Sequence, residues 1–198
     1  MNLKKLFIKH CEKYNFEVNQ SQLSVINNLT DFYKSNFKNS NIFNIFKTKN
    51  KKFGYYLVGD VGVGKTMILN FFFNQLKEKK LRLHFNEFMV KFHDFIFNCK
   101  NKESGIEDFV KDLNNKTQII YFDEFQVTNI VDAMILGRLF KKIFEAKIKV
   151  IFSSNIKIDD LYKDGLQRDQ FIPFLEVLKY YSIERELLIK DDYRSNKI

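Results

Sequence analysis

Four glycines lie between positions 54 and 64, and three of them belong to the stretch Gly59-Asp60-Val61-Gly62-Val63-Gly64-Lys65-Thr66. Glycines let successive backbone N–H groups point to one side, and such a loop, closed by a helix N-terminus, binds phosphates. The spacing is that of the G-x-x-x-x-G-K-[ST] loop, in which Lys65 reaches the β- and γ-phosphates and the Thr66 hydroxyl holds Mg²⁺. All eight residues are therefore predicted to bind a nucleotide.

The residues around this loop support the prediction. Lys52–Val58 is short, apolar and aromatic, as expected of a strand, and residues 67–76 follow the loop as a helical pattern without a breaker. A glycine turn that matches the motif by chance is the alternative. Strand, loop and helix in this order are the context that the motif requires, so the phosphate-binding interpretation is favoured.

Asp123 and Glu124 end a second apolar run, Gln118–Phe122. A carboxylate at a strand tip can hold the water shell of Mg²⁺ opposite Thr66, and this is predicted for Asp123. Glu124 would then orient and polarise an attacking water. Two adjacent acids also occur at solvent-exposed helix N-termini, but four preceding apolar residues after a phosphate loop favour catalysis.

Asn155 directly follows another apolar strand pattern, Ile148–Phe152, after two serines. An amide at this position would lie between the metal carboxylate and the γ-phosphate and could position the lytic water. By itself the segment fits a strand-ending turn equally well, because Ser and Asn favour turns. The two preceding motifs favour the catalytic interpretation.

The patterns alternate between strands and helices along the chain. We expect a mostly parallel α/β sheet covered by helices on both sides, with ligands bound beyond the carboxyl ends of its strands. The expected strands are residues 52–58, 81–85, 118–122 and 148–152, and the expected helices are residues 3–14, 22–37, 67–76, 87–98, 106–114 and 132–145. We expect residues 1–50 to form an N-terminal helical segment with an Asn- and Lys-rich link, and residues 51–198 to form the ATPase core.

The composition permits one domain with a sizeable core. The 198 residues are 45% hydrophobic and carry a net charge of +9, which would suit a nucleic acid or acidic membrane as partner. Basic residues are scattered apart from Lys47–Lys52, so neither is favoured. Cys11 and Cys99 lack metal-ligand spacing, no apolar run is long enough to span a bilayer, and the N-terminus lacks a signal peptide. A cytoplasmic location is expected.

Several longer strings resemble the ZapE/AFG-like family of AAA+ ATPases. The resemblance runs from about Gly54 to Arg194 and is carried by Phe122–Thr128, Asp132–Phe140, Ser154-Asn155, Asp159–Arg168, Phe171–Phe174 and His84–Met89. A His is more familiar in the family where Asn86 stands. Asn155 then corresponds to the sensor 1 residue of AAA+ ATPases.

The resemblance implies ATP hydrolysis by a ring-shaped homo-oligomer that uses Mg²⁺. Bacterial members are linked to cell division at the inner membrane face, and mitochondrial relatives to turnover of membrane proteins. In such rings an arginine reaches the γ-phosphate of the neighbouring subunit, and Arg168 is the candidate here. An ordinary surface ion pair is the alternative for Arg168. Arg138, the rival, is expected to serve packing or subunit contact.

The sequence also departs from the family pattern. Ile156-Lys157-Ile158 replaces a common Arg-Pro-Pro segment, and Asn129 stands where Asp is usual. Relatives continue beyond the equivalent of Asp192-Tyr193-Arg194, so we expect the helical lid and second sensor arginine to be largely absent. An ATP-gated adaptor with little turnover is therefore one alternative to an ATPase that cycles by itself. A DNA-associated loader ATPase, as in other compact AAA+ proteins, is another. A small-molecule kinase is disfavoured by the acid pair and Asn155.

Overall fold

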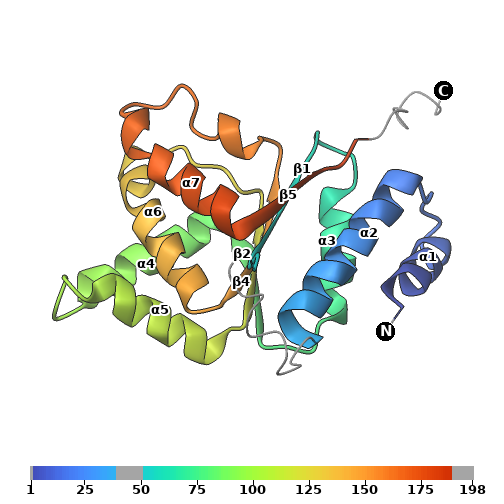
Figure 1. Cartoon of the computed structure of the whole chain (residues 1–198), viewed down its shortest axis with the longest axis horizontal. Helices are drawn as coiled ribbons and strands as arrows, with labels where there is room; N and C mark the ends of the chain where they lie inside the picture. The colour runs from blue at the N-terminus through green and yellow to red at the C-terminus, as the bar shows by residue number, and fades with distance from the viewer. Residues whose placement is uncertain (1, 39–50, 189–198) are drawn as a thin grey trace.

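A five-stranded parallel sheet forms the centre of the molecule (Figure 1). The computed structural model describes residues 2–38 and 51–188. The strands lie in the order β2-β3-β4-β1-β5, and every adjacent pair is parallel. Their bounds are β1 Gly54–Val58, β2 Lys80–His84, β3 Ile119–Asp123, β4 Lys149–Ser154 and β5 Ser182–Glu186.

Helices cover both faces of this sheet (Figure 1). The chain runs from β1 outward to β2 and then returns through β3 and β4 to β5, and right-handed crossovers in opposite directions must use opposite faces. Accordingly α3 (Lys65–Gln75) lies on one face, together with α1 (Leu3–Lys13) and α2 (Gln20–Tyr33). The other face carries α4 (Phe85–Asn98), α5 (Gly105–Lys116), α6 (Ile130–Glu145) and α7 (Ile172–Tyr181).

Each face buries its own hydrophobic cluster, because successive side chains of a strand point to opposite sides. Tyr55, Leu57 and Tyr121 pack with α1, α2 and α3. Tyr56 and Phe122 pack with the remaining helices. All residues of β1 and β3 are buried, as expected for central strands of a parallel sheet.

The predicted α/β class and the parallel sheet are confirmed. The predicted strands and helices all form, with ends that differ by a few residues; the second helix, for example, ends in a π-helical turn, Lys34–Lys38. Sequence reasoning did not include α7 or β5. The predicted Asn- and Lys-rich link falls largely outside the described residues, as does Asp192-Tyr193-Arg194.

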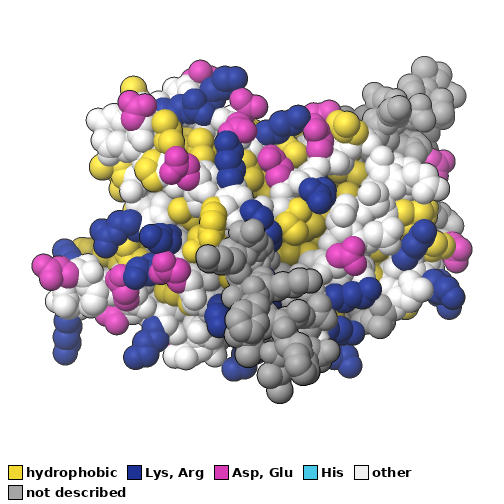
Figure 2. All heavy atoms as spheres, in the orientation of Figure 1, with side chains coloured by type: hydrophobic (Ala, Val, Ile, Leu, Met, Phe, Trp, Pro, Cys, Tyr) yellow, Lys and Arg dark blue, Asp and Glu magenta, His cyan; other side chains and the backbone are white. Residues whose placement is uncertain are grey.

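The surface does not gather its basic side chains into one patch on the face drawn in Figure 2, where Lys and Arg alternate with Asp and Glu. This distribution agrees with the scattered basic residues of the sequence. Within the described ranges, none of the helices combines the length and the apolarity needed to cross a bilayer.

Candidate functional site

The carboxyl ends of the neighbouring strands β1 and β4 lie side by side at the same end of the sheet. Val58 is in register with Ser154, and the Gly59 N–H donates to the Ser154 carbonyl at 3.3 Å. After β1 the chain turns into α3 on one face, whereas after β4 it leads to α7 on the other face. Neighbouring connections that diverge in this way open a crevice, the usual ligand position in such sheets. The phosphate loop and Asn155 therefore meet here.

The loop adopts the backbone conformation for which its glycines were predicted. Gly62 and Gly64 have φ angles of 86° and 92°, a region that residues with a Cβ rarely adopt. Gly64 is the residue before α3, and among the described side chains none caps the start of this helix. The first N–H groups of α3 have no intrahelical partner, so they are donors suited to an anion.

The Lys65 ammonium is held inside the loop by three acceptors. Its Nζ donates to the carbonyls of Gly59 and Asp60, both at 2.7 Å, and to Asn155 Oδ1 at 2.8 Å. Burial lowers the pKa of Lys65, and the negative charges of Asp60 and Asp123 oppose that shift. The structure thus brings Asn155 into direct contact with the loop lysine.

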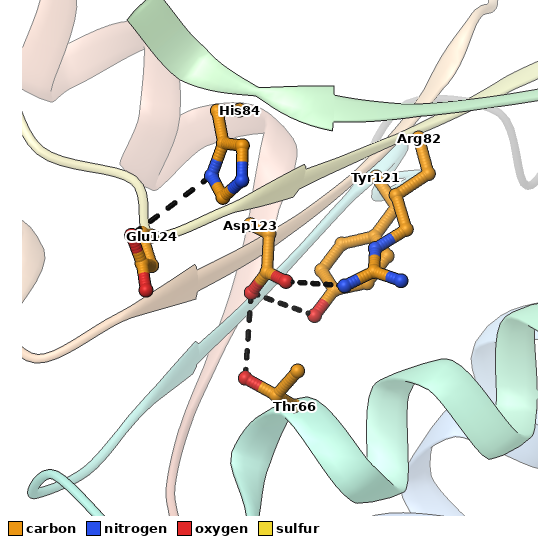
Figure 3. Close-up of polar contacts among 6 residues, drawn as sticks. All are labelled: Thr66, Arg82, His84, Tyr121, Asp123 and Glu124. Atoms are coloured by element: carbon orange, nitrogen blue, oxygen red, sulfur yellow. Dashed lines mark hydrogen bonds and ion pairs between the residues drawn. The ribbon is translucent and has the colours of Figure 1, made fainter.

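Asp123 lies at the tip of β3 opposite the first turn of α3 (Figure 3). Thr66 Oγ1 donates to Asp123 Oδ1 at 3.4 Å, and the Tyr121 hydroxyl donates to the same oxygen at 3.0 Å. Arg82 donates to the other oxygen, Oδ2, at 2.6 Å. Burial raises the pKa of Tyr121, and the Asp123 charge raises it further, so this hydroxyl keeps its proton and serves as a donor.

Glu124 points away from this cluster because its backbone has a φ of 53°. Its neighbours Asp123 and Phe125 are both buried, and the Phe125 N–H donates to the Ser153 carbonyl at 2.7 Å. These anchors hold Glu124 in a left-handed conformation that costs about 1–3 kcal/mol. Its side chain is 80% exposed, and its carboxylate lies 3.9 Å from His84 Nδ1 (Figure 3).

A pocket of about 380 Å³ joins the phosphate loop, Glu124 and the segment that follows β4, whereas Asp123 lies beside Thr66 without lining it. It is lined by Val61, Gly62, Lys65, Thr66, Glu124, Phe125, Gln126, Ser153, Ser154, Asn155 and Ile156. In the described part of the chain, no cluster of three or more His, Cys, Asp or Glu side chains could hold a metal by itself. Mg²⁺ usually needs only one or two carboxylates, with water and substrate phosphates as further ligands. The hydroxyl of Thr66 beside the Asp123 carboxylate fits that requirement.

Arg168 does not join the other predicted site residues within the chain. It begins a 3₁₀ turn before α7, and its guanidinium donates to the Asp159 carbonyl at 2.7 Å. It does not line the pocket that contains Lys65 and Glu124. The rival Arg138 lies on α6 and lines a separate groove of about 650 Å³ between α6 and α7.

Sequence reasoning did not single out Arg82, Tyr121 or His84, which surround the acid pair. The alternation of β2 puts Arg82 and His84 on one face, and Tyr121 lies two residues before Asp123. The two-residue spacing within each of these pairs can be read from the sequence. It identifies a site only once β2 is known to be the neighbour of β3.

Comparison with known proteins agrees with this geometry. A family model described as AFG1-like ATPase matches residues 1–197. Lactation elevated protein 1 homolog B of Danio rerio is 38% identical over 157 residues, which cover 73% of this chain and 31% of the relative. The cell division protein ZapE of Escherichia coli (strain K12) is 37% identical over 142 residues, 71% of this chain and 38% of the relative. The chain thus spans about a third of the length of these curated relatives.

The fold has counterparts among solved structures. The crystal structure of DnaI is similar with a TM-score of 0.60 and 17% identity, over 88% of this chain and 89% of that chain. At this identity the likeness concerns the fold alone. With the family match over nearly the whole sequence, it follows that the chain belongs to the AFG1-like ATPase family.

Proposed function

We propose that this chain binds ATP and hydrolyses it with Mg²⁺. The observation that carries the proposal is the meeting of three separate segments at one crevice. Lys65 contacts Asn155 at 2.8 Å, and Thr66 contacts Asp123 at 3.4 Å. Glu124 lines the same pocket as Lys65, Thr66 and Asn155.

The loop 59–66 binds the triphosphate in this proposal. Its glycine conformations expose backbone donors, and the Lys65 ammonium exchanges its carbonyl partners in the loop for phosphate oxygens. Thr66 and Asp123 hold the metal, directly or through its water shell. Mg²⁺, when bound, neutralises charge that develops on the phosphate oxygens.

Glu124 and Asn155 act on the attacking water. The exposed Glu124 carboxylate accepts a hydrogen bond from water and orients it towards the γ-phosphate, as water-positioning residues do in this chemistry. The Asn155 amide, already bonded to Lys65, lies where it can contact both the terminal phosphate and that water. The water oxygen bonds to the γ-phosphorus while the bond between that phosphorus and the β–γ bridging oxygen breaks, so ADP and inorganic phosphate form without a covalent enzyme intermediate.

Glu124→Gln tests this assignment. The amide keeps the size of the side chain but is a poor hydrogen-bond acceptor towards the attacking water, so phosphate release should fall by about 100-fold or more. ATP affinity should stay within about 2-fold, because Glu124 contacts the water rather than the triphosphate. Steady-state phosphate release and calorimetric ATP binding measure the two quantities.

Glu103→Gln is the matched control, because Glu103 is an exposed glutamate in the loop before α5. It should behave as the unchanged chain does. Unchanged turnover in Glu124→Gln would refute the role of Glu124. ATP binding without any phosphate release by the unchanged chain would favour the adaptor alternative instead.

We extend the proposal to assembly and location. ATPases of this type complete their sites between subunits, so we propose that the whole protein acts as a homo-oligomeric ring with Arg168 supplied by the neighbour. ZapE is named as a cell division protein, and this supports a cell-division or membrane-associated partner for a cytoplasmic ATPase. Crosslinking of the whole protein in cells, followed by identification of the captured chains, tests that partner class.

A further inference from the structure

Arg82 lies on the edge strand β2, diagonally across from Asp123. Arg82 is in register with Tyr121, and His84 is in register with Asp123. Residues in register on adjacent strands point to the same face, so Arg82, Tyr121 and Asp123 share the face that α3 covers. Diagonal neighbours on one face are within reach of long side chains.

The guanidinium of Arg82 is fixed from two sides (Figure 3). One nitrogen donates to Asp123 Oδ2 at 2.6 Å, and the guanidinium carbon lies 5.3 Å from the centroid of the Tyr121 ring. The Tyr121 hydroxyl in turn donates to Asp123 Oδ1. Arg82 and Tyr121 therefore support each other and together hold both oxygens of one carboxylate.

The two oxygens of Asp123 are used differently. Oδ2 faces Arg82, whereas Oδ1 faces Thr66 and the first turn of α3. The Asp123 side chain is 7% exposed and that of Arg82 is 43% exposed, so the arginine compensates a buried charge while remaining accessible to water itself. The oxygen directed towards Thr66 carries no cationic partner among these contacts and is the one available to a metal or its water shell.

We propose that Arg82 is a positioning residue for Mg²⁺: it fixes the Asp123 carboxylate so that Oδ1 faces Thr66. This inference rests on the proposed function of the site. Residues that orient a metal-binding side chain typically change metal affinity by 10- to 100-fold when removed, although they never touch the metal. Arg82 should therefore affect the Mg²⁺ dependence of the site rather than nucleotide binding as such.

Arg82→Ala and Arg82→Lys test the inference, with Arg185→Ala as control. Arg185 is an exposed arginine on β5, the opposite edge strand. Calorimetry with a non-hydrolysable ATP analogue is carried out with EDTA and over a series of Mg²⁺ concentrations. Phosphate release over the same series provides a second measurement, and thermal unfolding shows whether each variant folds.

With EDTA, all variants should bind the analogue within about 2-fold of the unchanged chain. For each variant, the Mg²⁺ midpoint is the concentration at which the analogue affinity lies halfway between its values with EDTA and with saturating Mg²⁺. This midpoint should rise about 10-fold or more in Arg82→Ala and should not change in Arg185→Ala. Arg82→Lys should lie between them, because an ammonium keeps the charge but loses the planar contact with Tyr121. If Arg82→Ala does not fold, Arg82→Lys decides by the same Mg²⁺ shift.

An unchanged Mg²⁺ profile with lowered thermal stability would overturn the inference, because Arg82 would then only stabilise the fold. A lower Mg²⁺ requirement would also overturn it, because Arg82 would then compete with the metal. If the unchanged chain binds the analogue equally well with EDTA and with Mg²⁺, the proposed metal site itself fails. If only the variants depart from expectation, the proposed function stands and the positioning by Arg82 does not.

Discussion

Gly64 combines a φ of 92° with a position directly before α3, where the phosphate loop becomes a helix. A Cβ at Gly64 would meet no atom closer than 3.6 Å, so space does not exclude a side chain. Conformation does, because a residue with a Cβ pays about 1–2 kcal/mol in the left-handed region. Gly64→Ala should therefore lower the free energy of unfolding by about that amount and weaken ATP binding as the loop relaxes.

Gly137→Ala provides the opposite case. Gly137 lies inside α6 and does not have a positive φ. The atom nearest to a Cβ added at Gly137 would be the Phe174 backbone nitrogen, at 3.4 Å. Alanine is favoured over glycine inside a helix by up to about 1 kcal/mol, so stability should be equal or higher. Urea unfolding of both variants measures the contrast. Equal effects of the two substitutions would contradict the conformational explanation.

Among the site residues, those defined by local spacing were predictable, and those defined by sheet pairing were not. Lys65 and Thr66 follow from the loop motif, and Asp123 from its place after an apolar strand. Arg82 contacts Asp123 across 41 positions of sequence, and only the pairing of β2 with β3 makes that contact possible. The functions assigned to these side chains remain predictions; the Mg²⁺ series and the Arg82 substitutions test those of the metal site and of Arg82.

At the scale of elements, α2 begins with a reciprocal pair of hydrogen bonds. The Asn19 side chain accepts from the Gln22 N–H at 2.8 Å, and the Gln22 side chain accepts from the Asn19 N–H at 3.3 Å. Removing such a cap typically costs 0.5–2 kcal/mol. Asn19→Ala should lower the free energy of unfolding by about 1 kcal/mol, measured by urea denaturation followed by circular dichroism.

Asn27→Ala is the control within the same helix. Asn27 is exposed in the middle of α2, where alanine is the better helix former, so this variant should be as stable as the unchanged chain or slightly more so. Because α2 packs in one cluster with α1, α3 and β1, unfolding should remain a single transition in both variants. Loss of α2 in a separate, earlier transition of Asn19→Ala would contradict this coupling.

The strand that was not predicted, β5, shows which elements cannot be recognised from local sequence patterns. The strand β5, Ser182–Glu186, contains three charged residues and one large apolar residue, so it lacks the apolar run of a buried strand. It forms because its backbone pairs with β1 from Gly54 to Val58. The central strands β1, β3 and β4 each contain at least three consecutive apolar residues and were predictable for that reason. Local composition indicates whether a strand is buried, but it does not indicate which strand it pairs with.

At the scale of the whole molecule, Arg168 does not line the pocket of its own chain. Mixing of variant subunits tests whether it acts instead at the site of a neighbouring subunit. Arg168→Ala and Glu124→Gln should each abolish most phosphate release. In a mixture, a subunit with an intact Glu124 can receive Arg168 from a Glu124→Gln neighbour, so part of the activity should return. The experiment uses the whole protein under conditions where sedimentation shows an oligomer.

Arg138→Ala, mixed in the same way, is the comparison, because Arg138 is an exposed arginine on α6. If phosphate release recovers in the mixture with Arg138→Ala but not in the mixture with Arg168→Ala, Arg138 rather than Arg168 is the arginine that acts on the neighbouring subunit. No recovery in either mixture would indicate that neither arginine acts across a subunit boundary. The expected recovery is partial, because only some of the neighbouring pairs contain one variant of each kind.

The position of β1 in the sheet has a consequence for how the protein is made. Both neighbours of β1 come from far later in the chain: Val58 lies beside Ser154 on one side and Glu186 on the other. During translation the phosphate loop therefore emerges from the ribosome well before the strands that anchor it. Under the proposed function, nucleotide would bind only after these strands have paired, so it would stabilise the folded sheet and could not act as a template for the nascent loop.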